Sequence, residues 1–266
     1  MPHVAGGADD HRVSPRTLFA LVAGAVALSA FVGESSTATA GSRACGVDVA
    51  GNGGYTYAGH QASYRGHGVR ATIALRSAPR VEAGHVSGWV GVGGPGQGAN
   101  GEDAWIQVGV AAMHGLEPFL YAEITRGGRQ PQFILLENGV RVGEPRNLAV
   151  LEMAGRPGWW RVWVDGNPVT NPVHLRGSSG RWAPIATAES WNGGEVACNR
   201  FAYRFERVSV SSGGGGSWKP FVSAYRFLDS GYKLRPLATS AEPGVRARRL
   251  STSSPAPLPY AFEASS

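Results

Sequence analysis

The sequence predicts an all-β fold, an antiparallel sandwich or barrel, from three observations. Short apolar runs recur along the chain, and turn residues such as Glu137-Asn138-Gly139 separate them. No segment keeps the 3.6-residue period of an amphipathic helix. Short strands at regular spacing, with turn residues between them, are typical of this fold class.

Nine runs are expected to form strands, after an irregular first strand in the glycine- and tyrosine-rich segment 41–68. β-branched and aromatic residues are frequent in these runs, and they suit a pleated, half-buried surface. In chain order the runs are Val69–Leu75, Gly88–Val92, Ala104–Ala112, Phe119–Thr125, Gln132–Leu136, Asn147–Met153, Trp159–Val164, Ile185–Trp191 and Phe201–Val210.

A hairpin is expected directly after the run Trp159–Val164. Asp165-Gly166 follows this run at once, and Asn167 comes next. Asp-Gly is one of the dipeptides favoured in the tight turns that join antiparallel strands.

Residues 1–40 have the pattern of a secretory signal peptide. A polar segment with Arg12 and Arg16 precedes the apolar run Leu18–Val32, and Ala38-Thr39-Ala40 supplies an A-x-A cleavage motif. The apolar run is short for a membrane span. We therefore expect a secreted, extracellular protein. The alternative is an uncleaved leader, through which alone the protein would contact a membrane.

One β domain is expected over residues 45–221, because the chain beyond the leader is long enough for one sizeable core. The segment Ser211–Ser217 has the composition of a flexible linker. Trp218–Tyr232 is expected as an edge segment. Ser240–Ser266 mixes Pro, Ser and Arg, so residues 222–266 are predicted to be a largely disordered C-terminal tail.

The two cysteines, Cys45 and Cys198, are expected to pair in a disulfide, as cysteines of exported proteins commonly do. Such a bridge would tie the start of the domain to a late strand. In the chain-entropy model it would contribute up to about 5 kcal/mol.

The formal net charge of +6 is carried almost entirely by arginines, which are scattered along the chain. No nucleic-acid-binding module accompanies them, so no nucleic-acid partner is expected. The charge indicates solubility or attraction to an anionic cell envelope.

Several chemistries are disfavoured by their sequence context. Gly91–Gly96 fits the letters G-x-G-x-x-G, but no helix is expected after it, so the segment indicates a loop beside a cleft. The histidines are dispersed without metal-ligand spacing. Gly177–Gly180 lacks the nucleophile elbow of serine hydrolases. We therefore expect neither a metal nor an organic cofactor.

Polar side chains stand within three of the apolar runs. Gln107 shares a strand face with Trp105 and Gly109, while Glu189 and Glu123 lie in two other runs. If these faces line one concave sheet, they form a polar cleft with aromatic walls, suited to a peptide or a polysaccharide. The alternative is that these groups satisfy one another in a core or lie on a solvated face.

Four short motifs resemble, in the same order, those of the glutamic peptidases, or eqolisins. They are Gly88-Trp89-Val90-Gly91, Ile106-Gln107-Val108-Gly109, Tyr121-Ala122-Glu123, and Ala188-Glu189 followed by Trp191. The resemblance implies a secreted protease with a concanavalin A-like jelly roll, an antiparallel two-sheet β-sandwich. The chain departs from the family pattern at Gly93, at Ser190 and at Asn192-Gly193-Gly194.

The same resemblance implies that Gln107 and Glu189 are the catalytic residues. Glu189 would be the general base toward water and then the acid toward the leaving amine, while Gln107 would orient the water and stabilise the oxyanion. We expect both on adjacent strands, within reach of one water. Substrate-binding residues would be Trp89, Tyr121, Glu123 and Trp191.

Two other functions are compatible with the same residues. One is a non-catalytic, lectin-like domain that binds carbohydrate of the cell envelope. The other is a glycoside hydrolase that uses Glu123 and Glu189, whose carboxyl groups would then have to lie about 5–9.5 Å apart.

Overall fold

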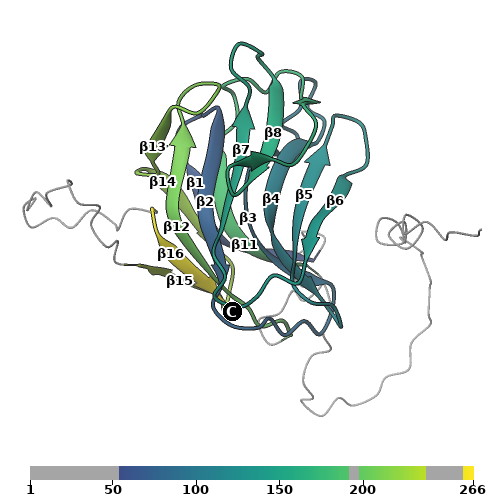
Figure 1. Cartoon of the computed structure of the whole chain (residues 1–266), viewed down its shortest axis with the longest axis vertical. Coiled ribbons are helices and arrows are strands. Elements are labelled where there is room, and N and C mark those ends of the chain that lie inside the picture. The colour runs from purple at the N-terminus through teal and green to yellow at the C-terminus, as the bar shows by residue number, and fades with distance from the viewer. Residues whose placement is uncertain (1–53, 192–197, 238–259) are drawn as a thin grey trace, which may run out of the picture. The chain divides into compact units, whose positions relative to one another are not determined.

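A computed structural model describes residues 54–191, 198–237 and 260–266 of the chain. These residues belong to one compact unit, Ser42–Ser266. They form two antiparallel β-sheets (Figure 1). No helix among them is long and apolar enough to cross a bilayer. The predicted all-β, antiparallel two-sheet sandwich is therefore confirmed.

The first sheet has seven strands in the described residues, and its centre is built from strands that are distant in sequence. β11 lies between β1 and β3, and β4, β5 and β6 continue the sheet as a meander. In spatial order the strands are β14 (Ala224–Leu228), β1 (Tyr55–Ala62), β11 (Pro184–Trp191), β3 (His85–Gly94), β4 (Ala104–Met113), β5 (Phe119–Thr125) and β6 (Gln132–Asn138).

The second sheet has nine strands in the described residues, with β2 and β12 at its centre. Its order is β10 (Val173–His174), β8 (Trp159–Val164), β7 (Arg146–Glu152), β2 (Gly68–Leu75), β12 (Ala202–Ser211), β16 (Phe262–Ser265) and β15 (Lys233–Pro236). Two short strands join this path, β13 (Trp218–Pro220) beside β12 and β9 (Asn167–Pro168) beside β8.

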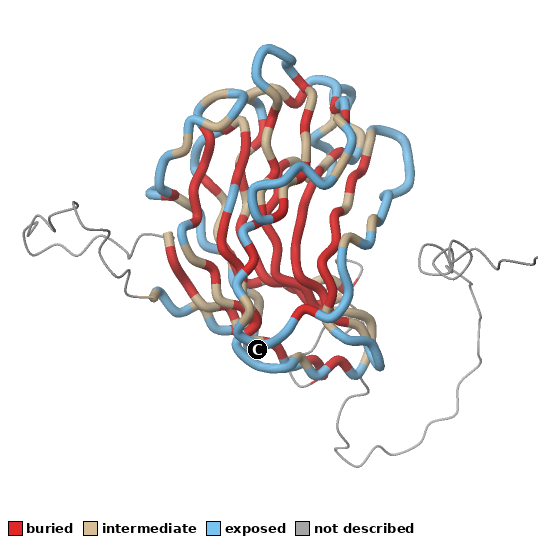
Figure 2. The backbone as a smooth tube through the Cα atoms, viewed as in Figure 1, coloured by how far each residue is buried: buried red, intermediate tan, exposed pale blue. Residues whose placement is uncertain are grey.

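The core lies between the two sheets and follows from strand alternation. Ile106, Val108 and Val110 of β4 face it from the first sheet, and Val162 and Phe205 face it from the second. Figure 2 shows the buried positions running along the strands, with exposed residues gathered in the connecting loops. Each sheet therefore has a second face, which points away from this core.

The nine predicted runs all correspond to strands, with ends that differ by a few residues at most. The hairpin at Asp165-Gly166 is also confirmed. Val164 pairs with Asn167, so the loop has two residues, and their φ angles of 49° and 83° are both positive. Asp and Gly tolerate this left-handed backbone better than most residues do.

The structure differs from the sequence predictions at both ends of the domain. Segment 41–68, which was expected to be an irregular strand, contains the regular strand β1, which pairs with β11 and β14. The expected linker Ser211–Ser217 is a short connection that returns the chain as β13, with Ser211 opposite Trp218.

The predicted disordered tail, 222–266, is corrected where the structure describes it. β14 extends the first sheet, and β15 and β16 extend the second. Phe262 and Ala264 of β16 are fully buried. Short strands are stabilised here by pairing with distant segments, which local composition does not report.

The predicted leader, residues 1–40, and Cys45 lie outside the described residues. Cys198 is buried. The disulfide between Cys45 and Cys198 therefore stays a prediction.

Candidate active site

The outward face of the seven-stranded sheet gathers the polar residues singled out in the sequence. Along β4 the even-numbered residues enter the core, so Trp105, Gln107 and Gly109 face outward, as alternation predicted. The same rule places Glu189 of β11 and Glu123 of β5 on this face, because their neighbours Ala188 and Ala122 belong to the core. Three of the predicted polar groups thus share one surface.

A chain of hydrogen bonds connects Gln107 to Glu189. The Gln107 Nε2 atom donates to the Tyr121 hydroxyl at 3.2 Å, and that hydroxyl donates to Ser87 Oγ at 3.3 Å. Ser87 Oγ in turn donates to Glu189 Oε1 at 2.8 Å. All four residues are at least nine-tenths buried. The chain brings together side chains from β4, β5, β3 and β11.

Each donor in this chain points toward Glu189. The amide can only donate from Nε2, the two hydroxyls each donate onward, and the carboxylate accepts. Burial first, and then the charges of Glu189 and Glu123, raise the pKa of Tyr121 well above its ordinary value. Tyr121 therefore remains a neutral phenol whose O–H group donates a hydrogen bond to Ser87.

The strand order corrects one sequence expectation. Gln107 and Glu189 do not lie on adjacent strands, because β3 stands between β4 and β11. Their backbones are therefore two strand spacings apart, about 10 Å, and they are also offset by four residues along the strands, about 13 Å, because Gln107 is in register with Ile185 of β11. We expected one shared water between them. In the described residues the connection is a pair of hydroxyl groups from Tyr121 and Ser87.

An aromatic group surrounds the carboxylate of Glu189. His85 Nε2 lies 3.4 Å from Glu189 Oε1, and the His85 ring stacks on Trp191 at a centroid distance of 5.6 Å. Tyr55 packs against both rings at 6.2 Å and stacks on Tyr57 at 6.1 Å. One side of the candidate site therefore has an aromatic wall.

A second aromatic group lies on the β5 and β6 side of the same face. Tyr121 stacks on Phe133 at 5.4 Å, and Phe119 meets the same ring edge-on at 6.0 Å. Phe133 is 38% exposed, so this wall is open to solvent. Polar groups of the site thus lie between two aromatic surfaces.

Glycines make room for the large side chains of this face. A Cβ added to Gly109 would lie 2.6 Å from the Trp89 Cβ and 3.0 Å from the Tyr121 ring. Trp89 is buried, and its indole nitrogen has no hydrogen-bond partner among the described residues. Gly109 is therefore required for close packing of the two rings that the sequence assigned to substrate binding.

Glu123 lies on the same face and is bound by Trp105, whose Nε1 donates to Glu123 Oε1 at 2.8 Å. Burial raises the pKa of Glu123. The Trp105 hydrogen bond opposes this shift, and the charge of Glu189 adds to it. Glu123 therefore holds its proton to a higher pH than an ordinary glutamate does.

Replacing Glu123 should change the pH dependence of stability. A carboxyl group whose pKa rises on folding binds its proton more tightly in the folded state. Its ionisation therefore costs stability as pH rises from its ordinary pKa of 4.5 through the folded value. We expect Glu123→Gln to raise Tm above that window and to leave Tm nearly unchanged below it, because the amide oxygen still accepts from Trp105.

Thermal melts of both proteins across pH measure this difference. Glu117→Gln, at an exposed position between β4 and β5, is the matched control, because it removes a glutamate charge away from Glu123. A Glu123→Gln protein with no gain in Tm at neutral pH would contradict the raised pKa.

The structure adds residues that the sequence reasoning did not select. Ser87 and His85 contact Glu189, and Trp105 contacts Glu123. Alternation from Trp89 could have placed Ser87 and His85 on the outward face. In the described residues no group of three or more His, Cys, Asp or Glu side chains could hold a metal ion.

No protein-family model and no curated protein sequence matches this chain. Solved structures do match it. A scytalidoglutamic peptidase bound to a peptide-based transition-state analogue is 14% identical, with a TM-score of 0.49, and the match covers 79% of this chain and 97% of that one.

Two further matches illustrate the range of proteins with this architecture. SCP-B, an eqolisin in complex with the tripeptide Ala-Ile-His, is 14% identical, with a TM-score of 0.43 over 79% of this chain and 96% of that one. An alginate lyase from Pseudomonas aeruginosa is 15% identical, with a TM-score of 0.39 over 56% and 68%. All of these identities are below 25% and all of these TM-scores are below 0.5, so no activity is inferred from the matches.

Proposed function

We propose that the outward face of the seven-stranded sheet hydrolyses peptide bonds, with Gln107 and Glu189 as the catalytic pair. The observation that carries this proposal is the directed hydrogen-bond chain from the Gln107 amide, through two hydroxyls, to the Glu189 carboxylate. The order of the motifs around these residues, which resembles that of the glutamic peptidases, supports the same pair.

The proposed nucleophile is a water molecule. Glu189 takes a proton from it while the water oxygen bonds to the carbonyl carbon of the peptide. As the C–N bond breaks, Glu189 gives that proton to the leaving nitrogen, so the carboxylate is restored. Gln107 has two N–H groups, and the one not directed at Tyr121 would stabilise the oxyanion.

Ser87, His85 and Tyr121 are assigned as positioning residues. Ser87 and His85 contact the same oxygen, Glu189 Oε1, so we assign the proton transfer from water to Oε2. Tyr121 fixes the Gln107 amide by accepting from it. The side chains that react are thereby held on rigid strands, which favours a defined geometry for attack.

The substrate we propose is a peptide with apolar or aromatic side chains. Such side chains would pack on the aromatic group that includes Tyr55 and Trp191, and on the group formed by Tyr121 and Phe133. The extended peptide would cross several strands of the sheet, and Trp89 would pack beneath it.

Strand spacing argues against Glu123 and Glu189 as a glycosidase pair. Glu123 and Glu189 come from β5 and β11, which are separated by β3 and β4. Their backbones are therefore about 14 Å apart. In register, Glu123 lies across from Gln107, Gly91 and Ile185, so Glu123 and Gln107 are both offset from Glu189 by four residues along the strands. Carboxyl groups of glycosidases lie about 5–9.5 Å apart.

Gln107→Ala tests the proposal on the purified protein. Loss of the amide removes oxyanion stabilisation, so kcat/KM for a peptide should fall about 10²–10³-fold with KM little changed. Cleavage of a peptide pool, followed by mass spectrometry, identifies a substrate for this measurement.

The matched control is Gln130→Ala, at an exposed position between β5 and β6, which should keep full activity. Undiminished cleavage by Gln107→Ala would exclude Gln107 from catalysis. Release of reducing sugar from a glycan panel, without peptide cleavage, would replace the proposal with a glycoside hydrolase.

A further inference from the structure

A groove of about 860 Å³ lies on the outward face of the other sheet, away from the candidate active site. Its floor comes from β2, β7 and β8, and its edge from β12, β13 and Tyr260. Because the two outward faces are on opposite sides of the core, this groove and the candidate active site are separate.

Three arginines from three different strands line the groove: Arg70 of β2, Arg161 of β8 and Arg207 of β12. Among the described residues, none of the three forms an ion pair with a carboxylate. The Nε atom of Arg161 is buried without a hydrogen-bond partner in the same set of residues. Arg207 donates to the Thr72 hydroxyl at 3.1 Å. The groove therefore concentrates positive charge that these residues do not neutralise.

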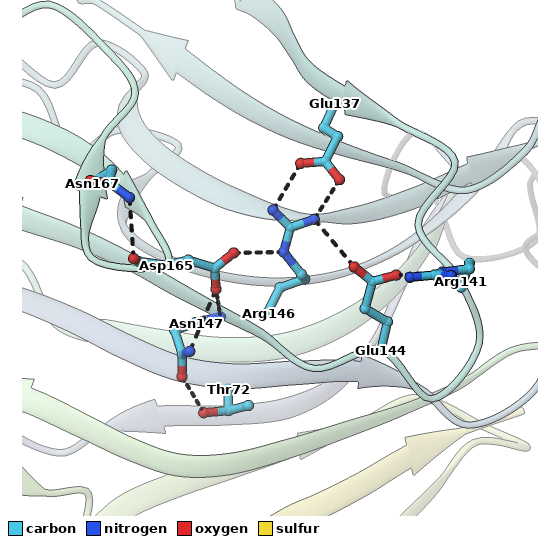
Figure 3. A network of polar contacts seen from close by, with 8 residues as sticks. All are labelled: Thr72, Glu137, Arg141, Glu144, Arg146, Asn147, Asp165 and Asn167. Atoms are coloured by element: carbon cyan, nitrogen blue, oxygen red, sulfur yellow. Dashed lines mark hydrogen bonds and ion pairs between the residues drawn. The ribbon is translucent and has the colours of Figure 1, made fainter.

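The two carboxylates that line the groove are already bound elsewhere. Glu152 is buried, pairs with His67 and accepts from the Gly158 amide. Asp165 accepts from Arg146 at 2.7 Å and from the backbone N–H of Asn147 at 2.8 Å, within the network that Figure 3 shows. Neither carboxylate therefore pairs with the groove arginines, and an external anion could do so.

The backbone at Arg207 has an unusual conformation for an arginine. Its φ is 51°, and it lies in the bulge where the pairing of β12 with β2 shifts between Glu206 and Ser209. A left-handed backbone is uncommon for residues other than glycine, and bulges commonly redirect a side chain beside a functional site. The bulge places the Arg207 side chain at the groove, near Arg70.

Aromatic rings accompany the arginines. Trp163 of β8 and Trp218 of β13 both line the groove, and the Arg70 guanidinium lies 4.7 Å above the Trp218 ring. The indole nitrogen of Trp163 is buried without a partner among the described residues. Flat rings with a nearby donor suit stacking against a sugar ring.

We propose that this groove binds an acidic polysaccharide. Carboxylates of uronate units would pair with Arg161 and Arg207, because the guanidinium fork matches a planar carboxylate in a bidentate way. A sugar ring would stack on Trp163, while the Arg70 guanidinium already covers one face of Trp218. Binding here would hold the protein on an anionic matrix while the opposite sheet stays accessible. The proposal does not depend on peptidase activity.

Calorimetry with an oligogalacturonate hexamer tests the proposal on the full chain. The wild type should bind it, more weakly as salt rises, and should not bind a neutral glucan hexamer. Arg161→Gln and Arg207→Gly should each weaken binding by about tenfold or more, because each removes a charge-assisted pair. Glycine suits the φ of 51°, so Arg207→Gly should keep the Tm of the wild type.

Arg129→Gln is the matched control, since it removes the same charge from an exposed position between β5 and β6. Its binding should equal that of the wild type. Equal losses in Arg129→Gln and the groove variants would overturn the proposal, as would wild-type binding of the neutral hexamer or no binding of the uronate hexamer. Tighter binding of a single-stranded oligothymidylate would also overturn it, in favour of nucleic acid.

Discussion

Glu189→Gln is expected to lower kcat/KM for peptide cleavage by about 10²–10⁴-fold, the range for loss of a general base. The amide has the shape of the carboxylate and can still accept from Ser87 at the position of Oε1. It cannot take a proton from water. Because packing is preserved, Tm should change little, and the loss should lie mainly in kcat.

Glu117→Gln is the matched control for this substitution. Glu117 lies at an exposed position between β4 and β5, so replacing it removes the same charge without touching the candidate site. Its kcat/KM should equal that of the wild type. Unchanged cleavage by Glu189→Gln would show that another group activates the water.

Phe262→Ala is expected to lower the free energy of unfolding by about 3–5 kcal/mol, as is usual for truncation of a buried aromatic side chain. Phe262 is 1% exposed and stacks on Phe205 at a centroid distance of 4.5 Å. Its ring also meets His60 edge-on at 4.9 Å. Denaturant unfolding of both proteins measures the difference.

The control for this prediction is Tyr225→Ala, which removes an aromatic ring that is 67% exposed on β14. Its effect should stay within about 0.5 kcal/mol. If Phe262→Ala destabilised the protein no more than Tyr225→Ala, then β16 would contribute little to the core. The sequence-based view of residues 222–266 as a tail would then regain support.

Strand alternation in the sequence predicted most of the fold. In β4 the period of two separated Gln107 from Ile106 and Val108, and the structure keeps that division between the outward face and the core. The turn at Asp165-Gly166 could also be predicted from local sequence, because these two residues suit positive φ angles without contacts to distant segments.

Features that depend on strand order could not be obtained in this way. The position of β3 between β4 and β11 is set by pairing between segments that are far apart in the sequence. The separation of Gln107 from Glu189 therefore does not follow from their sequence spacing. The contact of Ser87 with Glu189 does not follow from it either. The short strand β16 was also not predicted, because its four residues show too little periodicity to be recognised.

The arginine groove shows the same limit. In sequence, Arg70, Arg161 and Arg207 are far apart and suggested only a diffuse positive charge. β2, β7, β8 and β12 bring them to one face. Scattered charge in a sequence is therefore compatible with a concentrated patch on a sheet.

The central claim, that Gln107 and Glu189 act as one catalytic unit, is tested most directly by kcat/KM of four proteins on one peptide. These are the wild type, Gln107→Ala, Glu189→Gln and the double variant. Groups that act in one step give strongly non-additive losses, so the double variant should be little worse than Glu189→Gln alone. Losses that multiply in the double variant, or a wild type that cleaves no peptide, would contradict the claim.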